Sequence, residues 1–86
     1  MKQVARRELL EAIAEQLCVD PTQICDSTRF ADLRADSLDM VELGMMIEEK
    51  FELDIQQQDA VGLKTFGDAV RFVEQRLGYS PWIEAE

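Results

Sequence analysis

The most informative stretch of this chain is residues 36–52, DSLDMVELGMMIEEKFE. The apolar spacing predicts an amphipathic helix over residues 37–52. Asp36 precedes this helix where a carboxylate can accept from free backbone amides, and Asp39 adds a second carboxylate in the same positive field. Ser37 is then not needed as a cap, so its hydroxyl is predicted to be exposed. The side chains that fall together on the expected core face are Met40, Leu43, Ile47 and Phe51.

A second, narrower apolar stripe lies far around the same helical wheel. It consists of Leu38, Val41 and Met45, interleaved with the acidic residues Glu42, Glu48, Glu49 and Glu52. A single exposed apolar residue is ordinary, and a core does not need this stripe. Three such residues at helical spacing inside an acidic rim instead favour a docking surface. The partner would have a hydrophobic groove ringed by arginine and lysine.

The remaining patterns predict an all-α fold. We expect three longer helices, over residues 3–17, 37–52 and 66–77, and one short helix around residues 58–61. Residues 18–35 are predicted to form a long loop that is attached to the core by single apolar residues. The expected architecture is a four-helix bundle, with residues 1–78 as one domain and residues 79–86 as a flexible tail.

Composition narrows the function classes. With 86 residues the chain has room for one small core, and its formal net charge of −9 disfavours binding to nucleic acid and insertion into anionic membranes. Its two cysteines, Cys18 and Cys25, match neither a redox pair nor a zinc pattern, so they are expected to be reduced packing residues in a cytoplasmic protein. No apolar run is long enough for a signal peptide or a membrane span.

The run from Phe30 to Leu43, with Asp-Ser-Leu-Asp at its centre, resembles the phosphopantetheine attachment region of acyl carrier proteins. The resemblance extends to Leu77. It implies that Ser37 bears a 4'-phosphopantetheine arm derived from coenzyme A, flanked by Asp36 and Asp39. It also implies that the helix over residues 37–52 is the recognition helix for a phosphopantetheinyl transferase and for acyl-transferring and synthase enzymes of fatty-acid, lipid or polyketide synthesis. The carrier is expected to be a monomer.

Three positions depart from this resemblance. Arg34 stands where such carriers usually have glycine, so the turn before Asp36 is not expected to use a positive φ. Cys18 replaces a common glycine after the first predicted helix. Gly44 lies within the predicted helix, where it lowers helix propensity and is expected to widen the interior. These departures favour a dedicated carrier over a housekeeping one.

Other functions fit the same residues less well. The chain contains no histidine, so Ser37 lacks an obvious base and is expected to be a substrate and not a catalyst. A calcium-binding loop from Asp32 fails because Arg34 occupies a ligand position and Leu43 replaces the terminal glutamate. Two alternatives stay open: a peptidyl or aminoacyl carrier domain, and a non-carrier acidic bundle that only binds other proteins.

Overall fold

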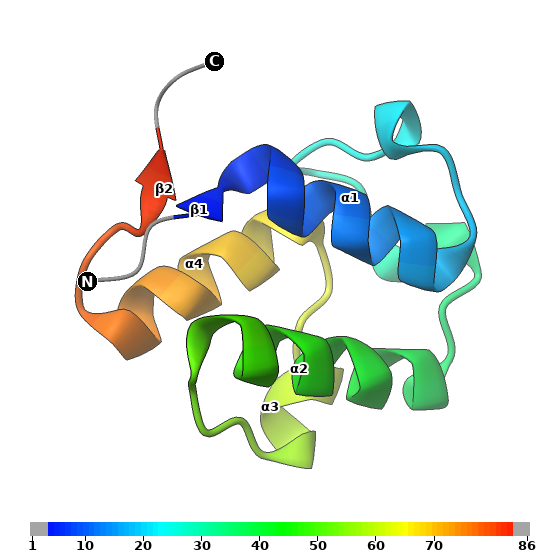
Figure 1. The fold of residues 1–86 in the computed structure, drawn as a ribbon. Coiled ribbons are helices and arrows are strands. Elements are labelled where there is room, and N and C mark those ends of the chain that lie inside the picture. Colours follow the sequence, from blue (N-terminus) through cyan, green and yellow to red (C-terminus); the bar gives the residue numbers. More distant parts are fainter. Residues whose placement is uncertain (1–3, 84–86) are drawn as a thin grey trace.

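The structure is a computed structural model that describes residues 4–83, and it confirms the predicted all-α architecture (Figure 1). Its four α-helices are α1 (Arg6–Leu17), α2 (Ser37–Phe51), α3 (Gln57–Val61) and α4 (Phe66–Leu77). Two short 3-10 helices, η1 (Pro21–Gln23) and η2 (Phe30–Leu33), lie in the long connection between α1 and α2. Two-residue strands, β1 (Val4–Ala5) and β2 (Trp82–Ile83), pair in parallel beside the start of α1.

The core lies between the three longer helices. Each contributes side chains that are almost fully buried, and the predicted core face of α2 is confirmed. The innermost of these side chains are Leu9, Ile13, Leu43, Ile47, Phe66 and Val73. Burial of this apolar surface is the main favourable term for so small a chain.

The long connection is held against the rest of the chain, as the sequence predicted. Ile24 and Phe30 are buried, and Leu33 packs against the core. Backbone hydrogen bonds also join this connection to the segment before α4: the Phe30 amide donates to the Lys64 carbonyl at 2.9 Å, and the Gly67 amide donates to the Asp26 carbonyl at 2.9 Å. These bonds fix the loop that leads into α2.

The C-terminal segment differs from the expected flexible tail. Pro81 and Trp82 are buried, and the Trp82 indole nitrogen donates to a Glu74 carboxylate oxygen at 2.6 Å. The pairing of β2 with β1 holds the same segment at the start of α1. Large aromatic surface is stabilised by such burial, which explains why residues 79–83 pack with the domain. Residues 84–86 of the predicted tail lie outside the described residues.

Gly44 does not widen the interior, contrary to the sequence-based expectation. It is buried where α2 packs against α3, and a Cβ built on it would lie 2.7 Å from the Cβ of Ala60. A real pair of carbon atoms does not approach so closely without a shift. Glycine at this position therefore allows α3 to pack directly on α2.

Three non-glycine residues adopt the left-handed conformation that usually favours glycine. They are Cys18 (φ 60°), Arg34 (φ 67°) and Glu52 (φ 57°). Arg34 and Glu52 are the C-terminal caps of η2 and α2. The expectation that the turn before Asp36 avoids a positive φ is thus wrong, because closing η2 requires this conformation whichever residue occupies the position.

Candidate functional site

The head of α2 is fixed by a reciprocal pair of hydrogen bonds. The Asp39 amide donates to an Asp36 carboxylate oxygen at 2.9 Å, and the Asp36 amide donates to an Asp39 carboxylate oxygen at 3.1 Å. This capping box satisfies two backbone amides at the helix start. Both acidic residues that the sequence predicted beside Ser37 are therefore brought to the predicted place, and their side chains have a structural task.

Ser37 occupies the first helical position and is exposed. Within residues 4–83 its hydroxyl takes part in no hydrogen bond, because Asp36 has taken over the capping position. The backbone amides of Ser37 and Leu38 are likewise without an acceptor in this part of the chain. The hydroxyl is thus accessible to a modifying enzyme, and two free amides point outward from the positive end of the helix.

The outer face of α2 carries the predicted apolar stripe. Leu38 is 65% exposed and Met45 is 61% exposed, while Val41 is half-buried. On the adjoining α3, Val61 is also exposed, at 39%. Sequence reasoning missed Val61, since a five-residue helix gives too short a pattern to assign faces. Large apolar side chains that stay in water on two packed helices are typical of a docking surface.

The acidic residues around this stripe are not equivalent. Glu49 is exposed, with no hydrogen bond to any other described residue, whereas one Glu42 carboxylate oxygen accepts from the Gln16 side chain at 2.6 Å. Glu48 is half-buried, and its carboxylate accepts from the Ile55 amide at 3.1 Å. Glu48 thus holds the connection between α2 and α3, and its charge is less available to a partner than that of Glu49.

Comparison with known proteins decides the family. The phosphopantetheine attachment site family matches residues 7–73 of this chain. An acyl carrier protein from Sulfurovum sp. (strain NBC37-1) is 44% identical over 68 residues, which cover 78% of this chain and 91% of that protein. The chain belongs to the acyl carrier protein family. Acyl carrier proteins of Wolinella succinogenes (44% identical over 68 residues) and Chlamydia caviae (46% over 67 residues) cover 78% and 77% of this chain, and 90% and 87% of their own lengths.

The group that this family carries is 4'-phosphopantetheine, and the head of α2 fits it. Attachment requires an accessible hydroxyl, which Ser37 provides, and the phosphate of the arm is an anion that free helix amides favour. The neighbouring Asp36 and Asp39 carboxylates oppose that anion, but both accept hydrogen bonds from backbone amides. Those bonds offset part of the repulsion.

Within residues 4–83, no three acidic, cysteine or histidine side chains are arranged to hold a metal ion. In the same part of the chain, no helix combines the length and the apolar character needed to cross a membrane.

Proposed function

We propose that Ser37 is the attachment point of the phosphopantetheine arm and that this acyl carrier protein presents acyl groups to enzymes of fatty-acid, lipid or polyketide synthesis. The observation that carries the proposal is the exposed Ser37 hydroxyl at the head of α2, left without a hydrogen-bond partner among the described residues by the Asp36–Asp39 capping box. When attached, the arm ends in a thiol that holds the acyl group as a thioester.

The chain's own role in this function is positioning and presentation. The Ser37 hydroxyl forms no hydrogen bond to a base among the described residues, and the chain has no histidine, so a phosphopantetheinyl transferase must activate it. A flexible tether then raises the effective concentration of the acyl group in the active site of each enzyme to which the carrier binds. We infer that the carrier itself is not an enzyme, and that it works as a monomer in the cytoplasm.

The proposed docking surface is the outer face of α2. Leu38, Val41 and Met45 supply its apolar stripe. Glu42 and Glu49 form the acidic rim, and Glu48 adds charge while holding the Ile55 amide. A partner with a basic rim would be steered towards this face and would release it quickly, as a carrier that visits several enzymes requires.

The chain-specific departures support a dedicated carrier. Arg34 places a cation three residues before Ser37, and Gly44 brings α3 onto α2. Either feature changes the surface or the packing next to the proposed attachment point. A transferase or synthase that recognises this carrier would therefore be matched to it.

Loading with coenzyme A tests the proposal. A broad-specificity phosphopantetheinyl transferase is expected to add one phosphopantetheine mass to the chain. The double charge reversal Glu42→Lys, Glu49→Lys is then expected to slow transfer to partner enzymes and to reduce its salt dependence, with the helical circular dichroism unchanged. A chain that gains no mass with such a transferase would rule out the carrier function.

A further inference from the structure

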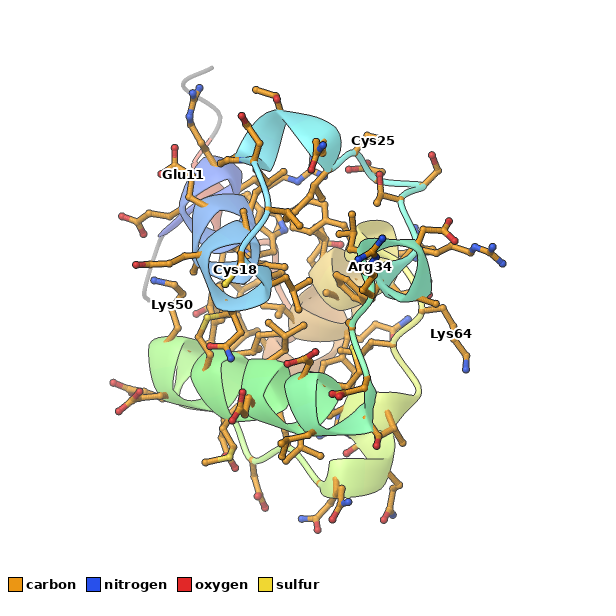
Figure 2. The ribbon with its side chains drawn as sticks, turned by 90° about the vertical axis from the view of Figure 1, so that its right-hand side faces the viewer. Glu11, Cys18, Cys25, Arg34, Lys50 and Lys64 are labelled. Atoms are coloured by element: carbon orange, nitrogen blue, oxygen red, sulfur yellow. The ribbon has the colours of Figure 1, made fainter. Side chains whose placement is uncertain are left out.

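A groove borders the first turn of α2, the turn that begins with Ser37. It has a volume of about 640 Å³ and lies between the C-terminal end of α1, the long connection and the first turn of α2. Asp39, two residues after Ser37, lines one part of it. Figure 2 faces this side of the protein, with Cys18 at the end of α1 and Arg34 across the groove. The groove therefore borders the helical turn that carries Ser37, on the side of α2 to which Asp39 and not Ser37 points, and a long arm enters it by crossing the start of the helix.

We propose that this groove binds the phosphopantetheine arm between visits to partner enzymes. The inference rests on the proposed attachment at Ser37. The arm carries, in order from Ser37, a phosphodiester, a carbon bearing two methyl groups, two amides and a thiol. The residues that line the groove include a cation, polar side chains, apolar side chains and a cysteine.

Arg34 is the partner for the phosphodiester. It is exposed, it lines the groove, and its guanidinium makes no ion pair with any described residue. The acidic Asp32 also lines the groove, but Arg29 pairs with it at 3.2 Å. Asp39 is committed to the Asp36 amide. The cation of Arg34 is thus left free to bind the phosphate, as arginine does with particular geometric fit.

Two glutamine side chains are the partners for the amides of the arm. The side-chain amide nitrogen of Gln16 donates to Glu42, which leaves its carbonyl oxygen to accept from an amide N–H of the arm. Gln23 is exposed in the groove, and its side chain forms no hydrogen bond within residues 4–83. It can both donate to and accept from a second amide.

The apolar and sulfur-bearing parts of the arm are also matched. Leu17, Val19 and Leu33 are partly exposed in the groove and supply apolar surface for the two methyl groups. Cys18, also exposed, lines the α1 side of the groove. Because Cys18 lines the groove, we expect the terminal thiol of an arm lying there to come near Cys18.

Disulfide capture with the loaded protein tests the proposal. Diamide oxidises the arm thiol and one cysteine thiol to a disulfide; the two thiols lose two protons and two electrons, which reduce diamide to its hydrazine. Cys25 is an internal competitor, because hydrogen bonds from the Ser27 and Thr28 hydroxyls lower the pKa of its thiol to about 7. Its ready ionisation would let Cys25 capture an arm that moves freely.

Digestion and mass spectrometry would identify the cysteine captured. The proposal predicts that the disulfide between the arm and Cys18 predominates over that with Cys25. Equal or greater capture by Cys25, or no capture of the arm within the chain, would overturn it. A protein that fails to load at all bears on the proposed attachment instead, so the two failures are distinguishable.

Charge-matched variants separate binding from simple proximity. Arg34→Gln is expected to lower the yield of the Cys18 disulfide about fivefold, which corresponds to about 1 kcal/mol for an exposed ion pair. Lys64→Gln removes an exposed cation that does not line the groove and is expected to leave the yield unchanged. Equal yields from both variants would remove Arg34 from the proposed site.

Nuclear magnetic resonance gives a second readout that needs no oxidant. Loading the protein is expected to shift the side-chain amide signals of Gln16 and Gln23, and these shifts should shrink in Arg34→Gln. Shifts confined to residues 36–39 would mean that the arm does not enter the groove.

Discussion

The indole of Trp82 stands edge-on against the ring of Phe51, with the two ring centroids 5.5 Å apart and their planes 81° apart. This contact joins the C-terminal segment to the last turn of α2, the helix that carries Ser37 at its other end. The C-terminal segment thus stabilises the packing of α2.

Replacing Trp82 should destabilise the protein. Trp82→Ala removes the contact with Phe51 and the hydrogen bond to Glu74, and is expected to lower the free energy of unfolding by about 3 kcal/mol. Trp82→Phe keeps an aromatic ring and loses the hydrogen bond, at a cost of about 1 kcal/mol. Urea unfolding followed by circular dichroism measures both. A Trp82→Ala variant as stable as the wild type would mean that this segment adds nothing to the fold.

Replacing Gly44 by alanine should lower the stability of the protein, although alanine has the higher helix propensity. Gly44→Ala raises propensity by about 1 kcal/mol, but its methyl group collides with Ala60 at an overpacking cost of about 1–3 kcal/mol. We expect a net loss of stability, and recovery when Ala60→Gly is added. Urea unfolding of the two single variants and the double variant gives the coupling energy. A stabilised Gly44→Ala protein would show that α3 moves aside easily.

Substitutions by glycine and by alanine at Cys18 and Arg34 test the left-handed backbone at these two positions. Cys18→Gly and Cys18→Ala both remove the thiol, but only glycine relieves the left-handed backbone. The glycine variant is expected to be the more stable of the two by about 1 kcal/mol, and the same order is expected for Arg34→Gly over Arg34→Ala. Thermal unfolding compares the pairs. If alanine matched glycine at both positions, the left-handed conformation would not be maintained in solution.

The ion pair between Asp59 and Arg76 should make stability depend on pH. The Arg76 guanidinium donates to Asp59 at 2.9 Å and to the Asp54 carbonyl at 3.0 Å, and this pairing, with the Gln56 amide, lowers the pKa of the Asp59 carboxyl. A carboxyl whose pKa is lowered on folding stabilises the folded state above the unfolded value, which is about 3.9, and loses that effect as the pH falls through the folded value.

Asp59→Asn is therefore expected to be less stable than the wild type at pH 7, with the difference shrinking as the pH falls below about 4. Asp54→Asn is the control, since only the backbone carbonyl of Asp54 takes part. Urea midpoints at several pH values measure the effect. A constant difference between Asp59→Asn and the wild type at all these pH values would assign the loss to packing instead of charge.

The elements predicted well are those encoded by local patterns. The Asp36–Asp39 cap, the core face of α2 and the start of α4 at Phe66 depend on residues close together in sequence, and the structure confirms all three. The burial of Trp82 depends on contacts with Phe51, about thirty residues away in sequence. Hydrophobic periodicity reports only on neighbouring residues, so it does not predict this contact.

In the candidate site, too, local patterns predict some features and contacts between distant residues decide the others. The exposure of Ser37 and the outer stripe of α2 follow from the helical pattern. The task of Glu48 at the Ile55 amide, and the groove between Cys18 and Arg34, depend on where the loops fold back. The backbone conformation of Arg34 was also not predicted, because the geometry of the turn that ends η2, and not the preference of arginine, decides it.

The most direct test of the account is to locate the phosphopantetheine within the loaded chain. Peptide fragmentation after loading with coenzyme A is predicted to place one phosphopantetheine on Ser37, and Ser37→Ala is predicted to abolish loading while Ser27→Ala and Ser80→Ala load normally. Phosphopantetheine found on Ser27 or Ser80, or continued loading of Ser37→Ala, would contradict the assignment of the head of α2 as the carrier site.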